Sequence, residues 1–183
     1  SECVFQLAVV NRPKEEKEFT EGNAAFSAQL CSLLRACGNN APFAMTSSVQ
    51  TALGNAYGNS KMEGEAALFA YEKETGAPVY VFRLANVFGK WCRPNYNSMV
   101  ATFCHNIAHD LPITIHDENA EVHLLYIDDL NEILIGLLEG CIPPVLTPEV
   151  FQELLPTASA EGIANALSAG HTYYTAWPNY RVT

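Results

Sequence analysis

Residues 41–61, APFAMTSSVQTALGNAYGNSK, join a short apolar run to the beginning of a helix. The run at 41–48 has the pattern of a buried strand and ends in hydroxyl residues. Residues 57–74 carry apolar side chains at helical spacing, and Gly76 follows where such a helix ends. The stretch therefore predicts a strand, a loop and a helix in direct succession.

Strands and helices alternate outward from this segment. Apolar runs predict further buried strands at 3–10 and 78–84, the first covered on both faces, and residues 19–37 predict a helix that Gly38 closes. Alternating buried strands and helices imply right-handed crossovers and a mostly parallel sheet. The fold class expected is α/β, with helices flanking the sheet.

The second half of the chain continues the alternation. We expect a helix at 98–109, strands at 112–117 and 121–127, and a helix at 128–140 whose N-terminus Asp128 or Asp129 can cap. Residues 156–170 are expected to be helical, and the sequence after them predicts little. No internal repeat divides the chain, so a single domain over 1–183 is expected.

Ligands of parallel α/β sheets bind beyond the carboxyl ends of the strands. In this chain those ends lie at 9–13, 46–50 and 84–89. Candidate functional residues are therefore expected in these three places.

Composition excludes several kinds of partner. The formal charge is −10 and the ten Lys and Arg residues are scattered, which argues against binding to nucleic acid or anionic membranes. The first residues lack the pattern of a signal peptide, and no apolar run reaches the ~18 residues of a membrane-spanning helix. A cytoplasmic protein is the default expectation.

Cysteine and histidine offer no clear ligand set. The six cysteines are far apart and include no Cys-x-x-Cys pair, so reduced thiols are the better interpretation. His105 and His109 have helical spacing but lack the glutamate of a zinc protease motif. We expect no metal site, with partly exposed helix residues as the plain interpretation of these histidines.

Tyr57 and Lys61 are four residues apart, which places both side chains on one face of the predicted helix. A cation a few Å away lowers the pKa of a phenol, so Lys61 could activate Tyr57 for proton transfer. A serine from the strand end, Ser47 or Ser48, could hydrogen-bond the carbonyl oxygen that the tyrosine protonates. The alternative is that Tyr57 packs, Lys61 is solvated and the serines only end a strand.

Beyond these residue-level arguments, the chain resembles the extended short-chain dehydrogenase/reductase family, whose members carry a Ser/Thr strand end, a Tyr-x-x-x-Lys helix and a strand that ends in R-x-x-N-V-F/Y-G. The corresponding pieces here are TSS, YGNSK and FRLANVFG. More narrowly, LAVVNRP, NVFGKWCRPNYNSMVATFCHNIA and YIDDL resemble the reductase domain of capsular polysaccharide enzymes that also carry a cupin domain. The resemblance covers residues 3 to about 140. It implies a Rossmann-like core at about 1–90 and a substrate-binding part at about 91–183.

The resemblance implies a role for each matching residue. Tyr57 would donate a proton to the keto group, Lys61 would bind the nicotinamide ribose and lower the pKa of Tyr57, and Ser48 rather than Ser47 would polarise the carbonyl. The remaining implied contacts are Leu7 and Ala8 to the cofactor, Leu84 and Asn86 to the nicotinamide and substrate, and Arg93, Asn95 and Asn97 to the sugar nucleotide.

Val49 and Gln50 stand where family members that dehydrate sugars place an acidic pair, and neither side chain can shuttle a proton. Carbonyl reduction and 4-epimerisation remain. The narrower resemblance favours reduction of a UDP-linked 4-keto-6-deoxy amino sugar by NADPH, or by NADH, in capsular polysaccharide biosynthesis. The alternatives are a nucleotide-sugar 4-epimerase and a non-catalytic binding or assembly module of the same fold.

The resemblance also implies what lies outside the matching region. The glycine-rich turn that holds the cofactor pyrophosphate in the family has no counterpart in the chain, and neither does the cupin domain. We therefore expect a truncated Rossmann-like sheet. A homodimer is expected through the helices at 19–37 and 57–74, whose small residues would allow close approach.

Overall fold

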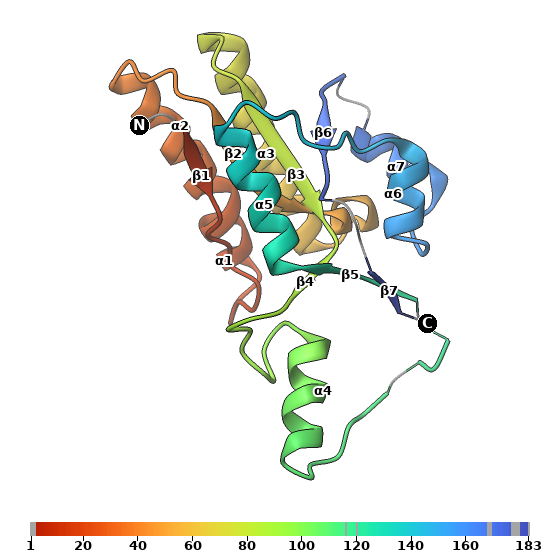
Figure 1. The fold of residues 1–183 in the computed structure, drawn as a ribbon. Helices are drawn as coiled ribbons and strands as arrows, with labels where there is room; N and C mark the ends of the chain where they lie inside the picture. Colours follow the sequence, from red (N-terminus) through yellow and green to blue (C-terminus); the bar gives the residue numbers. More distant parts are fainter. Residues whose placement is uncertain (1–2, 116, 120, 168–169, 177–179, 183) are drawn as a thin grey trace. The chain divides into compact units, whose positions relative to one another are not determined.

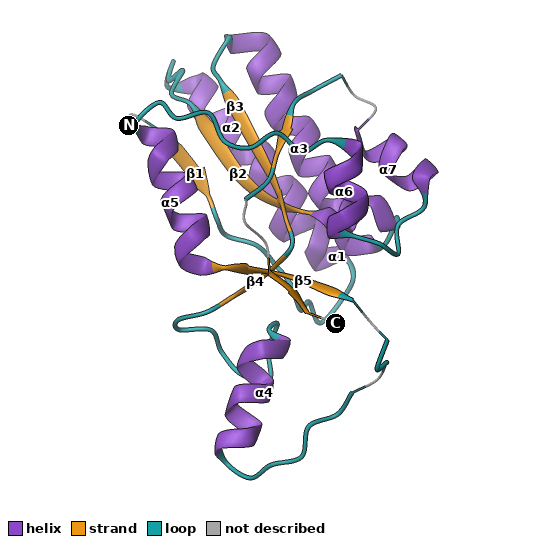
Figure 2. Cartoon of the chain, turned by 45° about the vertical axis from the view of Figure 1, so that its right-hand side comes forward, coloured by secondary structure: helices purple, strands orange, loops and turns teal. Residues whose placement is uncertain are grey.

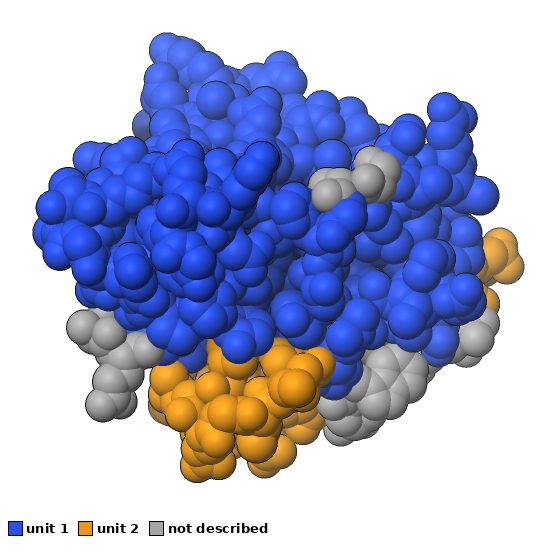
Figure 3. All heavy atoms as spheres, turned by 90° about the horizontal axis from the view of Figure 1, so that it is seen from above, with its two compact units in different colours: residues 1–83, 144–175 blue, residues 84–143, 176–183 orange. Residues whose placement is uncertain are grey.

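The computed structural model describes residues 3–115, 117–119, 121–167, 170–176 and 180–182. Within these ranges the chain forms two compact units (Figure 3), each described by itself below. Unit 1 comprises Ser1–Arg83 and Pro144–Thr175, and unit 2 comprises Leu84–Pro143 and Ala176–Thr183. The expected split into a core at about 1–90 and a substrate-binding part at about 91–183 stays a prediction.

Unit 1 is built on a four-stranded sheet with the order β1-β2-β3-β6 (Figure 1). Val4 of β1 pairs with Phe43 of β2, and Val81 of β3 pairs with Tyr173 of β6, both in parallel. The strands are β1 (Val4–Gln6), β2 (Phe43–Ser48), β3 (Val79–Leu84) and β6 (Tyr173–Tyr174). The mostly parallel sheet expected from the alternation of apolar runs is confirmed.

Helices of unit 1 flank this sheet, and Figure 2 shows α2 and α3 side by side on one of its faces. The expected helix at 19–37 is present as three successive pieces, because a π-helical stretch interrupts it. The helix expected at 57–74 is confirmed as α3. The helices are α1 (Lys17–Phe19), the π-helix η1 (Thr20–Ala25), α2 (Phe26–Ala36), the 3-10 helix η2 (Val49–Leu53), α3 (Ala56–Thr75), α6 (Pro148–Leu154) and α7 (Ala160–Leu167).

The core of unit 1 lies between the sheet and the α2–α3 pair. Phe43, Met45 and Val81 on the strands and Leu68 on α3 are completely buried. Burial of such side chains contributes roughly 1.5–3 kcal/mol each, which fixes the position of α3 on the sheet.

The first strand differs from expectation. β1 ends at Gln6 instead of residue 10, and Val4 and Phe5 are only half-buried. β1 lies at the edge of the described sheet, where β2 is its one neighbouring strand. Fewer atoms therefore surround the side chains of β1 than those of a central strand. The expectation that residues 3–10 form a strand covered on both faces was wrong.

Unit 2 contains a second sheet of order β4-β5-β7, in which β5 pairs in parallel with β4 and antiparallel with β7. Its strands are β4 (Asn86–Phe88), β5 (Val122–Tyr126) and β7 (Tyr180–Val182), and its helices are α4 (Met99–Ala108) and α5 (Ile127–Leu138). Ser98 caps α4, since its side chain accepts a hydrogen bond from the Ala101 N–H at 3.2 Å.

Three expectations for the second half need correction. The strand expected at 112–117 is absent, because residues 111–115 and 117 have no regular structure, while His116 lies outside the described residues. The N-cap of α5 is Tyr126, so Asp128 and Asp129 lie in the first helical turn, where their charge complements the helix dipole. Of the helix expected at 156–170, only α7 is present, and residues 168–169 lie outside the description.

Candidate functional site

The end of β2 and the beginning of α3 are joined by a tightly capped connection. Ser48 is the N-cap of η2, and its side chain accepts a hydrogen bond from the Gln50 N–H at 3.2 Å. The chain then turns at Gly54, whose φ of 64° favours glycine, and Asn55 caps α3 by accepting from the Gly58 N–H at 2.7 Å. These caps place Tyr57 in the first turn of α3.

Gly58 makes this connection possible, and we expect its replacement by alanine to lower the free energy of unfolding by about 1–3 kcal/mol. An added Cβ would lie 2.4 Å from the backbone oxygen of Gln50, which cannot rotate away. Urea denaturation of Gly58→Ala measures the effect. The control is Gly64→Ala on the same helix, where the nearest atoms belong to the side chains of Ser27 and Met45 and can shift. Equal losses in the two variants would contradict this explanation.

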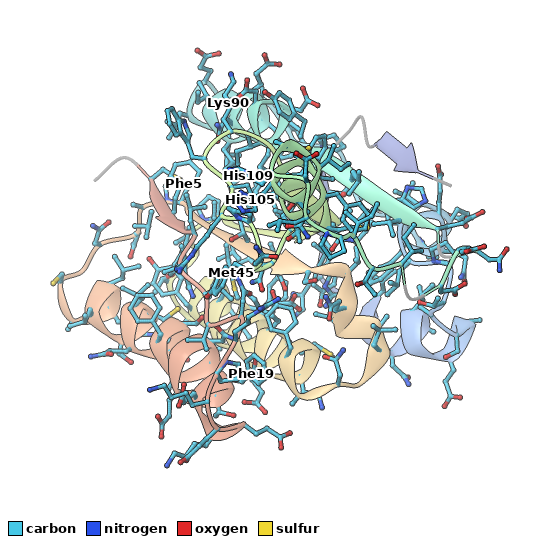
Figure 4. All side chains as sticks on the ribbon, turned by 90° about the horizontal axis from the view of Figure 1, so that it is seen from below. Phe5, Phe19, Met45, Lys90, His105 and His109 are labelled. Carbon is cyan, nitrogen blue, oxygen red and sulfur yellow. The ribbon has the colours of Figure 1, made fainter. Side chains whose placement is uncertain are left out.

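The structure brings Ser48, Tyr57 and Lys61 together at the end of β2. The Lys61 ammonium donates a hydrogen bond to the Thr46 carbonyl oxygen at 3.0 Å and lies 5.9 Å from the centroid of the Tyr57 ring. The Ser48 side chain lies near enough to the Tyr57 phenol to lower its pKa. Phe19, labelled in Figure 4, packs edge-on against Tyr57 with the ring centroids 5.7 Å apart.

Burial dominates the protonation of both groups. It lowers the pKa of Lys61 from 10.5 to about 8, and the charge of Glu65 opposes this shift. It also raises the pKa of the Tyr57 phenol, an effect that the hydrogen bond with Ser48 reduces. The net direction for Tyr57 is opposite to the lowering expected from Lys61, and the phenol is therefore protonated at neutral pH, the form that donates a proton.

The lowered pKa of Lys61 predicts a measurable dependence of stability on pH. Between about pH 8 and 10.5 the unfolded chain binds the lysine proton and the folded chain does not, so Lys61 makes the free energy of unfolding rise with pH. Relative to Lys61→Met, the wild-type protein should gain about 2–3 kcal/mol from about pH 7 to about pH 10. Burial raises the pKa of Cys31 to about 11, which makes the free energy of unfolding fall with pH in both proteins. Subtracting the profile of Lys61→Met from that of the wild type removes this common contribution. Parallel urea-denaturation profiles would contradict the prediction.

Leu7 and Ala8, predicted to line a cofactor, directly follow β1 and are exposed. The register pairs Gln6 with Met45, so these two residues lie at the same sheet edge as Thr46. The Thr46 hydroxyl donates to the Gln6 carbonyl oxygen at 3.4 Å and links the two strand ends.

Asn23, which the sequence analysis did not identify, fixes the segment that follows Leu7 and Ala8. Its side chain accepts from the Val10 N–H at 2.9 Å and donates to the Val10 carbonyl oxygen at 3.2 Å and to the Ser60 hydroxyl at 3.0 Å. The π-helix η1 carries this nearly buried side chain. The sequence signal that could have indicated this role is a single asparagine within a helical stretch of small residues.

A buried ion pair was also missed. Both nitrogens of one edge of the Arg83 guanidinium, Nε and Nη2, donate to the Glu65 carboxylate at 3.1 and 2.6 Å, and the two side chains are 0% and 2% exposed. The Ser47 hydroxyl donates to the same carboxylate at 2.5 Å. The available signal was an arginine inside an apolar strand pattern, which needs a buried acceptor.

The other predicted residues lie in unit 2. Leu84 is buried at the end of β3, whereas Asn86 and the candidates of the following loop are exposed. The Asn95 N–H donates to the Thr102 hydroxyl at 2.9 Å. The predicted residues of this unit are Leu84, Asn86, Arg93, Asn95 and Asn97.

Unit 2 also contains a cavity of about 380 Å³ beside the loop that carries these candidates. His105 of α4 lines it, and the ring of His109, the C-cap residue of α4, lies next to the His105 ring with the centroids 4.2 Å apart (Figure 4). In the described ranges, no group of three or more His, Cys, Asp or Glu side chains has the arrangement of a metal site.

The residues at the end of β2 fit a nicotinamide cofactor. An ammonium has three N–H donors, and Thr46 uses one of those of Lys61, so donors remain for ribose hydroxyls. The exposed apolar Leu7 and Ala8 at the same sheet edge suit contact with a flat ring.

None of the helices in the described part of the chain is both long and apolar enough to cross a bilayer.

Known proteins resemble the chain in sequence and structure. Residues 2–141 match the NAD dependent epimerase/dehydratase family. A UDP-2-acetamido-2,6-beta-L-arabino-hexul-4-ose reductase of Pseudomonas aeruginosa is 46% identical over 147 residues, which are 80% of this chain and 40% of that protein. CapF, a capsular polysaccharide assembling protein of Staphylococcus aureus, is 33% identical with a TM-score of 0.74, over 100% of this chain and 43% of its own.

A more distant structure has the same fold. A UDP-glucose 4-epimerase of Thermotoga maritima is 22% identical with a TM-score of 0.69, over 75% of this chain and 52% of its own. The chain thus spans less than half the length of the reductase and of CapF. The likeness to CapF confirms the Rossmann-like fold expected from the sequence, and the chain belongs to the NAD dependent epimerase/dehydratase family.

Proposed function

We propose that the chain carries the proton-transfer residues of an NAD(P)-dependent nucleotide-sugar reductase. The observation that carries this proposal is the convergence of Ser48, Tyr57 and Lys61 at the end of one parallel strand. The substrate proposed is a UDP-linked 4-keto-6-deoxy amino sugar. The Pseudomonas relative, whose name describes a reductase of a UDP-linked 4-ulose, supports this choice.

Each of the three residues has a distinct task in this reduction. When bound, NADPH supplies a hydride to the carbonyl carbon. Tyr57, protonated at neutral pH, gives its proton to the oxygen that becomes a hydroxyl, and Ser48 orients that oxygen by a hydrogen bond. Lys61 holds ribose hydroxyls, and its positive charge stabilises the phenolate that forms.

The further assignments are also proposals. Leu7, Ala8, Leu84 and Asn86 would contact the cofactor, and Ser48, Asn86, Arg93, Asn95 and Asn97 would contact the sugar nucleotide. NADP(H) is proposed over NAD(H). We also propose a cytoplasmic homodimer that acts in capsular polysaccharide biosynthesis.

A 4-epimerase is the second candidate, because epimerisation uses the same three side chains.

Dehydration is disfavoured by the residues that follow Ser48. Val49 is buried and apolar, and Gln50 cannot exchange a proton, so no side chain at these two positions can act as the acid or base.

Absorbance of NADPH during incubation of the purified protein with a UDP-linked 4-keto-6-deoxy amino sugar tests the proposal. We expect one NADPH consumed for each keto group reduced, and slower consumption of NADH. Interconversion of two 4-epimers without net NADPH consumption would identify an epimerase. Heat of binding from the UDP-sugar without turnover, measured by calorimetry, would identify a non-catalytic binding module.

A further inference from the structure

Two residues at the end of β2 are held by the proton-transfer face of α3. Lys61 donates a hydrogen bond to the Thr46 carbonyl oxygen at 3.0 Å, and the Ser48 side chain lies near enough to the Tyr57 phenol to lower its pKa. Tyr57 and Lys61 are one turn apart on the same helical face. The position of the strand end relative to α3 therefore decides whether the three groups meet.

Between those two contacts, Ser47 is held by the next turn of the same face. Its hydroxyl donates to the Oε1 atom of Glu65 at 2.5 Å, and Glu65 is four residues after Lys61. Ser47 and Glu65 are both buried, with 6% and 2% of their surfaces exposed. This contact joins β2 directly to α3 at the residue next to Ser48.

The Glu65 carboxylate is itself fixed from the other side. Arg83 of β3 binds both of its oxygens, donates from Nη1 to the Ala166 carbonyl oxygen at 3.0 Å, and stacks on the Tyr173 ring with its central carbon 3.7 Å from the centroid. The Glu65 carboxylate accepts three hydrogen bonds, one from Ser47 and two from Arg83. A buried negative charge thus has a single orientation, set by β2, β3, α7 and β6.

We propose, resting on the proposed function, that Glu65 is a positioning residue for the reduction. Through Ser47 it holds the end of β2 against α3 so that Ser48 and Tyr57 stay in contact, and it places a negative charge one helical turn from the Lys61 ammonium. It touches neither substrate nor cofactor.

The surroundings of Lys61 support this electrostatic role. The charge of Glu65 raises the pKa of Lys61 against the larger lowering by burial. Elements packed on this part of α3 present neutral groups to it, among them the Thr46 carbonyl of β2, Asn23 of η1 and Phe19 of α1. Titratable and charged groups of this cluster include Tyr57 and Glu65 on α3, Arg83 on β3 and Tyr173 on β6.

A purely structural role is the competing explanation, because Glu65→Gln leaves the Arg83 charge buried and unpaired and is expected to destabilise the fold. Two further variants separate the explanations. The double variant Glu65→Leu/Arg83→Met replaces the buried pair by apolar side chains, which commonly preserves stability. Ser47→Ala removes only the contact to the strand end and leaves the ion pair in place.

The first measurement is steady-state kinetics of NADPH oxidation. For the folded double variant and for Ser47→Ala, we expect kcat to fall at least about tenfold with little change in KM for the sugar nucleotide, because the reacting groups lose their alignment. A double variant with wild-type stability and wild-type kcat would show that Glu65 has only a structural role.

The second measurement does not depend on turnover. NMR titration of isotope-labelled lysine side chains follows Lys61, assigned with Lys61→Met, and we expect its pKa to fall in the folded double variant because the charge of Glu65 no longer raises it. If the wild-type protein reduces no keto sugar, the proposed function fails, and this titration still decides the role of Glu65. An unchanged Lys61 titration would overturn the proposed electrostatic role.

Discussion

Replacing Tyr57 by phenylalanine is expected to lower kcat for reduction of the keto sugar by about 10²- to 10⁴-fold, the usual contribution of a positioned general acid. The Ser48 side chain lies near enough to this phenol to lower its pKa, and the larger effect of burial keeps the phenol protonated. The variant retains the ring that packs against Phe19, so its fold should persist. NADPH oxidation at saturating sugar nucleotide measures the loss.

Tyr71→Phe is the matched control for this experiment. It makes the same chemical change on the same helix, where the Tyr71 hydroxyl donates to the Asn39 carbonyl oxygen at 2.7 Å. We expect it to lose about 1 kcal/mol of stability and to keep its rate. A Tyr57→Phe variant that retained most of the wild-type kcat would remove this residue from proton transfer.

Arg83→Met is expected to lower the free energy of unfolding by about 3–5 kcal/mol, because Glu65 would remain buried without its partner. Methionine fills much of the same volume, so the loss reports the missing charge more than a cavity. Urea denaturation measures it.

The control for Arg83 is Arg35→Met, which breaks an ion pair between α2 and α3. Arg35 lies 2.6 Å from Glu74, but the two side chains are 31% and 58% exposed. We expect a loss below about 1 kcal/mol, since exposed pairs contribute little. Equal losses in the two variants would mean that burial does not decide the strength of the Arg83 pair.

Much of unit 1 could be predicted because its elements carry strong periodic patterns. The apolar run at 41–48 and the helix that ends at Gly76 were found at nearly their observed bounds, since buried strands and capped helices have local signals. β4 and β6 were missed because strands of two or three residues carry almost no pattern. The π-helical turn of η1 was missed because the side chains around it are compatible with an ordinary helix.

The candidate site divides in the same way. Ser48, Tyr57 and Lys61 belong to one strand–helix connection, so their meeting follows from local geometry. Glu65 and Arg83 come together only when α3 lies on β3, and a sequence offers no direct measure of that packing. The raised pKa of Tyr57 likewise depends on burial by distant residues, which spacing along the chain does not contain.

The capped connection at 48–58 bears on how proteins of this kind can diversify. Short-range hydrogen bonds fix this connection at Ser48 and Asn55, so under the proposed function a change of sugar preference does not require the segment to be rebuilt. The loop that carries Arg93, Asn95 and Asn97 is exposed and, by contrast, open to substitution at positions other than Asn95, whose φ of 54° few side chains adopt without strain. Under the proposed function, new specificities are therefore to be sought by randomising that loop while Ser48, Tyr57 and Lys61 are kept.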